Sequence, residues 1–219
     1  MGLPKTGYTK TSAENFIIDS ATVFTDFKFD KNTGEFTGTP MGATSGGVEF
    51  NSEISYRKPE VDGAYVMDVV GLNVLESATA SIKANLIELT AENLRRSING
   101  TLEDAGEEAP VGYKVIKQKR YLQEGDYIPS VAVAGVHNGT KQPVIVVLDN
   151  GLVKSGLSLK TEDNKEAVIE QEITANASYE QLAKDEFPWR IYYPDTASTQ
   201  KNVAVNASAL NKQEYKTEG

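Results

Sequence analysis

The chain has 219 residues, with 22 basic and 31 acidic side chains, a formal net charge of −9 and no cysteine. This length suits one sizeable domain or two small ones. The absence of cysteine excludes disulfides, thiol catalysis and cysteine-ligated metals. This negative net charge is opposite in sign to that of typical nucleic-acid-binding proteins, which use Lys and Arg to contact phosphates.

Membrane segments and secretion signals are not visible in the sequence. No apolar run approaches the roughly 18 residues that a membrane-spanning helix requires. The opening residues, MGLPKTGYTKTSAENF, lack the apolar segment of a signal peptide. We therefore expect a protein that folds in the cytoplasm without a membrane anchor.

The first half of the chain predicts antiparallel strands. Residues 16–29 are rich in β-branched and aromatic side chains, and the turn at 32–34 predicts a hairpin. Residues 42–63 alternate apolar with polar side chains, although neither set resembles an ordinary core face. Segments 63–75 and 80–86 follow, so we expect a three-stranded meander.

One helix is well marked, over residues 90–100. Thr90 is a candidate N-cap, and Gly100 stands just past the predicted end. Leu94 and Ile98 have the spacing of a buried stripe. Because so short a helix is not stable alone, we expect it to pack on the sheet.

The second half repeats the strand pattern. Asn138-Gly139 predicts a hairpin, which leaves His137 as a solvated turn residue. The sequence after Asp195 has little apolar content, which is typical of a mobile tail. The predicted strands are residues 127–136, 142–150, 156–161, 166–178 and 189–193.

These patterns predict a mainly β fold: an antiparallel sandwich or barrel with one short flanking α-helix. We expect one domain over residues 1–194, with an N-terminal arm at 1–14, and a polar C-terminal tail at 195–219.

Catalytic chemistry finds no support in the sequence. There is one histidine, and no nucleotide-binding or nucleophile-elbow motif is present. Three pairs of neighbouring carboxylates lie in loop-like stretches, where acidic residues usually serve solubility: Glu107-Glu108, Glu162-Asp163 and Asp185-Glu186. Trp189 is interpreted as closing the core. We therefore expect no enzyme, no cofactor and no metal site.

The order of several motifs resembles the major tail tube proteins of long, non-contractile-tailed bacteriophages. The motifs are GATSGGVEF, EISYRKPEVDG, IKANLIELTAENLRRSING, PVIVVLDNGLVKSGLSLKTEDNKEAVIEQEITA and PWRIYYP, and the resemblance covers residues 15–194. It implies a β-sandwich that assembles into hexameric rings, with an inner β-barrel shared among the subunits. The same fold occurs in contractile tails and in type VI secretion tubes.

The resemblance also implies the partners and the location. Stacked rings would form a virion tail tube, assembled in the host cytoplasm, through which DNA passes without specific binding. A long loop or hairpin would contact the next ring. Besides further copies of the chain, the expected partners are the tape measure protein and the tail tip and terminator proteins.

An acidic lumen would repel phosphates and let DNA slide. The candidate lumen-facing acids lie between residues 42 and 73: Glu49, Glu53, Glu60, Asp62 and Asp68. The candidate inter-subunit residues are Gly46, Gly47, Val48, Phe50, Ile54 and Tyr56, with the glycine pair expected to allow a bulge.

Two other functions remain open at this point. A secreted β-sandwich that binds carbohydrate, or an adhesin, could use Trp189, Tyr192 and Tyr193 as its stacking surface. A hydrolase could use two carboxylates across a cleft, which sequence spacing cannot reveal.

Overall fold

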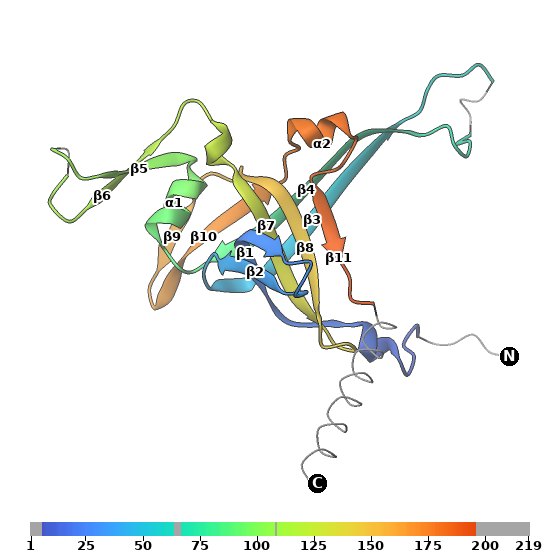
Figure 1. Cartoon of the computed structure of the whole chain (residues 1–219), viewed down its shortest axis with the longest axis horizontal. Coiled ribbons are helices and arrows are strands. Elements are labelled where there is room, and N and C mark those ends of the chain that lie inside the picture. Colours follow the sequence, from blue (N-terminus) through green and yellow to red (C-terminus); the bar gives the residue numbers. More distant parts are fainter. Residues whose placement is uncertain (1–5, 64–66, 108, 196–219) are drawn as a thin grey trace, which may run out of the picture. The chain divides into compact units, whose positions relative to one another are not determined.

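The computed structural model of the chain describes residues 6–63, 67–107 and 109–195 (Figure 1). The expected tail therefore lies, except for Asp195, outside the described residues. The elements are, in order, η1 (Ser12–Asn15), β1 (Ile17–Phe29), β2 (Phe36–Pro40), β3 (Thr44–Arg57), β4 (Val74–Leu86), α1 (Ala91–Ser97), β5 (Gly100–Asp104), β6 (Lys114–Gln118), η2 (Glu124–Asp126), β7 (Ile128–His137), β8 (Pro143–Val153), β9 (Leu159–Glu162), β10 (Lys165–Thr174), α2 (Tyr179–Ala183) and β11 (Trp189–Tyr192).

The predicted fold class is confirmed, since the structure is mainly antiparallel β with 49% of residues in strands. The large sheet has the order β2-β1-β7-β8-β10-β4-β3, with β11 paired to β8 and β9 paired to β10. This sheet is not closed into a barrel. Strands β5 and β6 form a separate two-stranded hairpin.

The chain divides into two compact units, each made of several segments. Among the described residues, the larger comprises 21–63, 67–107, 109–133 and 146–190, and the smaller comprises 6–20, 134–145 and 191–195. Strands β1, β7, β8 and β11 contribute residues to both. The expected boundary after residue 194 stays a prediction.

The core of the larger unit lies between strands that are distant in sequence. Val131 of β7 and Leu148 of β8 belong to one buried cluster with Ile82 of β4 and Ile173 of β10. The Gly151 backbone of β8 lies close to side chains of β7 and β10. A Cβ placed on Gly151 would lie 2.8 Å from side-chain carbons of Val131 and Ile173. Strand alternation thus gives one shared apolar core.

Helix α1 packs on the sheet through residues other than the predicted Leu94 and Ile98. Thr90 is the N-cap as expected, and its hydroxyl accepts a hydrogen bond from the Asn93 backbone N–H at 3.1 Å. The buried positions, however, are Asn93 and Ser97, whereas Leu94 and Ile98 are only half-buried. Gln171 Nε2 of β10 donates to the Asn93 carbonyl (2.9 Å) and the Ser97 hydroxyl (2.7 Å). Hydrogen bonds from Gln171 Nε2, rather than an apolar stripe, therefore hold this helix to the sheet.

The prediction that His137 is a solvated turn residue is wrong. The hairpin between β7 and β8 forms as expected, but the His137 side chain is only 1% exposed. Its Nε2 lies 3.0 Å from the Tyr193 hydroxyl. The adjacent turn is covered because the Gly139 N–H donates to the Glu14 carbonyl at 2.7 Å. All these contacts lie within the smaller unit.

Two further elements differ from the prediction. Residues 67–73 of the expected strand 63–75 are turns and loop, and β4 begins only at Val74. The short helix α2 was not predicted, although Ser178 caps it with a full capping box to Gln181. With only five residues, this helix offers little periodicity to detect.

A partly buried ion pair makes the larger unit sensitive to acid. The Asp126 side chain is 5% exposed, pairs with Lys119, and accepts from the Gln123 backbone N–H at 2.8 Å. The bond to Lys119, then that to Gln123, lowers the pKa of Asp126 below its ordinary value. A lowered pKa in the folded state stabilises the fold above the pKa of the unfolded state, and this contribution is lost as pH falls through the folded-state pKa.

Replacement Asp126→Asn should therefore lower the free energy of unfolding, by an amount that is full above about pH 5 and shrinks below about pH 4. Urea unfolding across this range measures the difference from wild type. Asp163→Asn, in the exposed turn between β9 and β10, is the matched control and should show no such trend. A constant Asp126→Asn deficit down to pH 2 would contradict the assignment.

Candidate assembly surface

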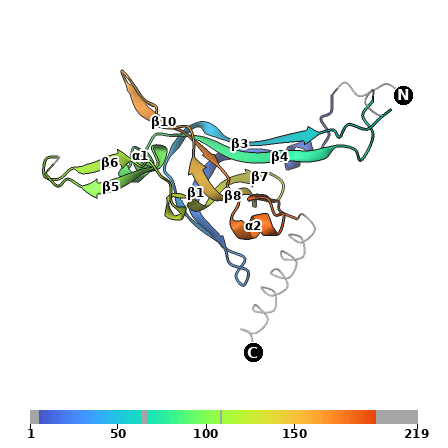
Figure 2. The same cartoon turned by 90° about the horizontal axis from the view of Figure 1, so that it is seen from above.

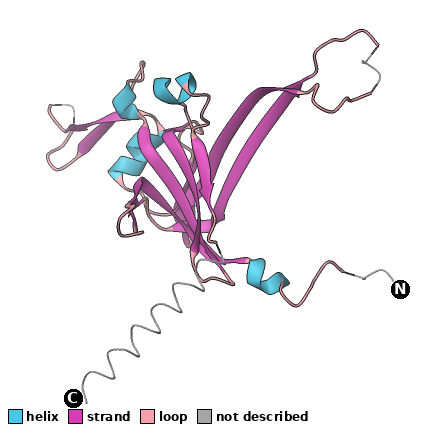
Figure 3. Ribbon diagram, turned by 45° about the vertical axis from the view of Figure 1, so that its right-hand side comes forward, coloured by secondary structure: helices cyan, strands magenta, loops and turns pink. Residues whose placement is uncertain are grey.

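Strands β3 and β4 form a long ribbon that extends past the rest of the sheet (Figures 2 and 3). Their pairing runs from Thr44 opposite Leu86 to Arg57 opposite Val74. Strand β10 pairs with β4 only over residues 81–86. Beyond Ala80, the ribbon therefore has no third strand among the described residues.

The glycine pair at the base of the ribbon has the predicted geometry. Gly46 and Gly47 have φ values of +82° and +89°, which favour glycine. The register of β3 against β4 shifts between Thr44 and Val48. The irregularity expected at this pair is thus present, but inside β3 rather than before it, and a role of the pair between subunits stays a prediction.

One face of the ribbon is mainly apolar, interrupted in β3 by Ser52, and its two halves differ in burial. Val48 and Phe50 pack against the core, and the Phe50 ring centroid lies 6.1 Å from that of Trp189. Farther out on β3, Ile54 is 51% exposed and Tyr56 is 61% exposed. The core face therefore continues onto an open surface.

The ribbon ends in a loop that adds to this open surface. The exposed apolar residues of the outer ribbon and the described part of the loop are Ile54, Tyr56, Val61, Met67, Val69, Val70, Val74 and Leu75. We call this set the ribbon tip. A concentration of exposed apolar side chains on one part of the molecule is typical of interaction sites in soluble proteins.

The opposite face of the ribbon is polar and acidic. Glu49 pairs across the strands with Lys83, and Glu53 pairs with Thr79. Strand β10 continues this face with Glu172, opposite Lys83, and Glu170, opposite Asn85. In the described registers of β3, β4 and β10, four glutamates thus share this face with Lys83 and with Arg57, which lies opposite Val74 at the outer end of the ribbon. We call it the acidic face.

The five candidate lumen acids separate into two groups. Glu49 and Glu53 lie exposed on the acidic face. Glu60, Asp62 and Asp68 lie exposed in the loop after β3, where Asp68 forms an ion pair with Lys58 at 3.3 Å. They are not on a strand because the expected meander is interrupted by this loop.

Glu170 and Glu172 were missed from the sequence. Glu172 is half-buried and accepts a hydrogen bond from the Ser81 hydroxyl at 3.0 Å, which joins β10 to β4. The signal was present, since the two glutamates alternate with the buried Ile169, Gln171 and Ile173. That alternation does not reveal which strand pairs with the segment that carries the two glutamates.

The aromatic residues of the alternative binding surface are partly engaged. Trp189 packs against the core cluster and lies 6.3 Å, between ring centroids, from Phe187, which confirms its interpretation as a core residue. Tyr193 is 61% exposed, with its hydroxyl bound to His137.

The described residues contain neither a metal-binding group nor a membrane-spanning helix. No group of three or more His, Asp or Glu side chains is arranged to hold a metal ion. Likewise, no helix in this part of the chain is long and apolar enough to cross a membrane.

Comparison with known proteins gives only distant likenesses. No protein-family model and no curated protein matches the chain. Among solved structures, it is similar to a chain of the native gene transfer agent virion, at 10% identity and a TM-score of 0.36, covering 73% of this chain and 92% of that one. A chain of the C6-symmetric tail of an empty gene transfer agent particle gives 15% identity and a TM-score of 0.33, covering 72% and 91%. A chain of the six-fold-symmetrised anti-feeding prophage baseplate gives 12% identity and a TM-score of 0.39, covering 88% and 97%. Likeness at this level is too weak to carry an argument about function.

Proposed function

We propose that the chain is a structural subunit of a phage-type tail tube, assembling as hexameric rings that stack around a channel for DNA. The ribbon carries this proposal. Its apolar face continues from the subunit's own core onto an exposed tip, and its other face is acidic. The order of sequence motifs, which resembles that of tail tube proteins, supports the same assignment.

The acidic face is the proposed lumen surface. Four glutamates against Lys83 and Arg57 in β3, β4 and β10 give each copy a net negative contribution on one continuous sheet face. Six such faces around a channel would repel the phosphates of DNA, so that DNA moves through without sticking. Glu49 and Glu53 keep their predicted role in this proposal, and Glu170 and Glu172 join them. Glu60, Asp62 and Asp68 would lie at a rim of the channel.

The sheet edges are the proposed joints within a ring. Strand β3 ends the order of the large sheet, and β9 lies on β10 away from that path. An exposed strand edge is a template for pairing with another chain. Joining β3 of one copy to β9 of the next would close the inner sheets into a shared barrel, which the single chain does not form.

The ribbon tip is the proposed contact with neighbouring subunits and with the next ring. Ile54 and Tyr56 serve this role because they are exposed. Val48 and Phe50 contribute indirectly, by holding the base of the ribbon on the subunit's core. The proposal assigns the chain no catalytic role, and its partners would be the tape measure, tail tip and terminator proteins of a virion tail.

The direct test is negative-stain electron microscopy of the purified chain over a range of concentrations. We expect six-fold rings or hollow tubes to form as the concentration rises. A chain that stays monomeric at every concentration, and also in the presence of a tail tip complex that could nucleate assembly, would overturn the proposal.

A further inference from the structure

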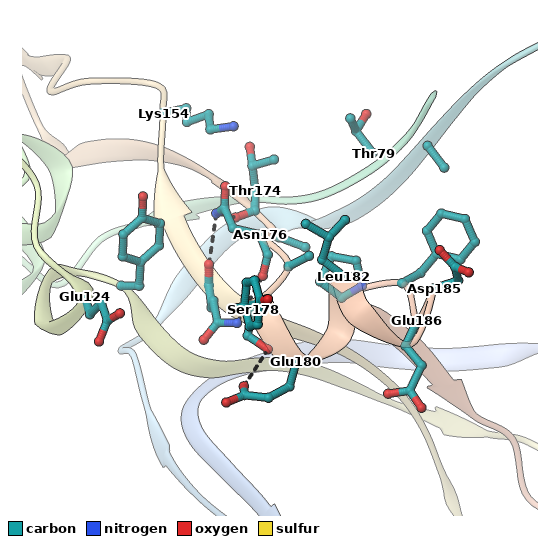
Figure 4. A pocket seen from close by; sticks show the side chains of 18 of the residues that line it. Thr79, Glu124, Lys154, Thr174, Asn176, Ser178, Glu180, Leu182, Asp185 and Glu186 are labelled. Carbon is teal, nitrogen blue, oxygen red and sulfur yellow. Dashed lines mark hydrogen bonds between the residues drawn. The ribbon is translucent and has the colours of Figure 1, made fainter. Parts of the chain in front are cut away.

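A groove in the larger unit adjoins the ribbon and shares Leu75 with the ribbon tip and Thr79 with the acidic face. Its volume is about 1200 Å³, and it runs between the edge of β4 and the segment that holds α2. Figure 4 shows Leu182 of α2 at the groove, with Thr79 of β4 and Glu124 on other sides of it. The proposed tube function gives this groove no role.

One wall of the groove is an open strand edge. The Ala80 carbonyl accepts from the Ala175 N–H at 2.9 Å, which is the last bond on this side of β4. Because main-chain groups alternate along a strand, those of Ala78 also point toward this side. No described strand pairs there, so an extended segment could add to the sheet by main-chain hydrogen bonds.

The other walls define the side chains that such a segment needs. Leu75, Leu182 and Phe187 line the groove and are 42%, 68% and 50% exposed, which favours an apolar or aromatic side chain. Around them stand four carboxylates and one lysine: Glu124, Glu180, Asp185, Glu186 and Lys154. None of the four carboxylates has an ion-pair partner among the described residues. The groove therefore suits an extended segment with one aromatic and one basic side chain on the same face.

The chain itself contains such a segment near its beginning. Residues 6–11, Thr-Gly-Tyr-Thr-Lys-Thr, are exposed and rich in β-branched side chains. Tyr8, which is 62% exposed, and Lys10 would lie on one face of a strand. Residues 1–13 include Lys5 and Lys10 and no acid, so their charge complements the groove. In the described part of the chain, the hydrogen bonds of residues 6–11 are all to residues within 6–15.

We propose that residues 6–11 of one copy dock as an added strand on the β4 edge of a second copy. Tyr8 would lie against Leu182 and Phe187, and Lys10 would reach the carboxylates at the rim. This inference rests on the proposed self-assembly, and it names the segment that links the copies. It also explains why the groove is built at the one place where β4 loses its third strand.

The absence of cysteine in the chain permits a clean cross-linking test. Tyr8→Cys and Leu182→Cys chains, one carrying a size tag, are mixed under assembly conditions and oxidised. We expect a disulfide-linked heterodimer on a non-reducing gel, in at least about tenfold excess over a mixture of Tyr8→Cys with Val111→Cys. Val111, on the separate β5–β6 hairpin, is fully exposed and thus equally accessible.

Charge reversal adds a second readout. Adding Lys10→Glu to the Tyr8→Cys chain should reduce the cross-link several-fold. Adding Glu180→Lys and Glu186→Lys to the Leu182→Cys chain should then restore it. No such rescue is expected if the two segments meet only by random collision.

The outcomes separate this inference from the proposed function. Rings or tubes that form without the heterodimer would overturn the docking of residues 6–11 and leave the tube proposal standing. A disulfide that forms only within one Tyr8→Cys/Leu182→Cys chain would make the chain's own segment the occupant, which also overturns it. A further chain lacks residues 6–11 and carries a cysteine at residue 203. If it cross-links to the Leu182→Cys chain as well as the Tyr8→Cys chain does, the groove belongs to the C-terminal region instead. Failure of all assembly would count against the proposed function itself.

Discussion

Replacing both Ile54 and Tyr56 with aspartate should abolish assembly while leaving the subunit folded. The two side chains are 51% and 61% exposed on the outer ribbon, so their loss should change the free energy of unfolding by only about 0.5 kcal/mol. In an assembly they would be buried, each contributing about 1.5–3 kcal/mol. The double variant should therefore weaken each subunit contact by about 3 kcal/mol, or roughly 100-fold.

Sedimentation velocity and electron microscopy measure the assembly, and thermal unfolding measures the fold. Tyr121→Asp is the matched control, because Tyr121 is 73% exposed and lies in the loop before η2, away from the ribbon. Normal tubes from the ribbon variant would contradict the role of the ribbon tip. Phe50→Asp would be uninformative, since Phe50 packs against Trp189 and the core.

Reversing the charge of the acidic face should convert a channel that repels DNA into one that retains it. In the variant Glu49→Lys, Glu53→Lys, Glu170→Lys, each copy would present three new cations on one sheet face. Tubes should still form, because cross-strand charge pairs contribute only about 0.2–1 kcal/mol each. Tubes assembled with duplex DNA should hold it against nuclease, and the retained amount should fall by about 10³-fold or more between 50 and 200 mM salt.

The matched control carries the same change in net charge elsewhere, as Glu35→Lys, Asp104→Lys, Glu107→Lys. Those residues are exposed and lie outside β3, β4 and β10. DNA bound by the control should remain open to nuclease digestion. Equal protection in both variants, or no protection in the first, would place the acidic face outside the channel.

Patterns among residues that are close in sequence predicted many of the strands and the main helix. Period-two alternation located the second half of β4, turn residues located the β7–β8 hairpin, and Thr90 marked the start of α1. Each of these signals depends on residues that are close in sequence. The strand expected at 63–75 failed because an exposed apolar loop and a buried strand have the same composition. Gly71, with φ of +86°, belongs to the described part of that loop.

Contacts between distant segments were beyond the sequence. His137 is buried because Tyr193 and the segment around Glu14 come to lie on its turn. In the same way, Glu49 and Glu53 could be selected from alternation within one segment, whereas Glu172 joins their face only through the pairing of β10 with β4. The bond from Ser81 to Glu172 spans 91 residues of sequence. No local pattern states which of several predicted strands will be neighbours.

The unequal lengths of β4 and β10 have a kinetic consequence. A two-stranded ribbon without a third strand is only marginally stable in water, and fixing each residue of it costs about 1–2 kcal/mol of backbone entropy. The outer ribbon, beyond Ala80, would thus become fully ordered only against other copies. Two free subunits must order both ribbons for a single contact, whereas a subunit joining an existing end meets a ribbon that is already fixed. In the proposed tube, elongation would then be favoured over initiation, and free subunits would assemble only where a template is present.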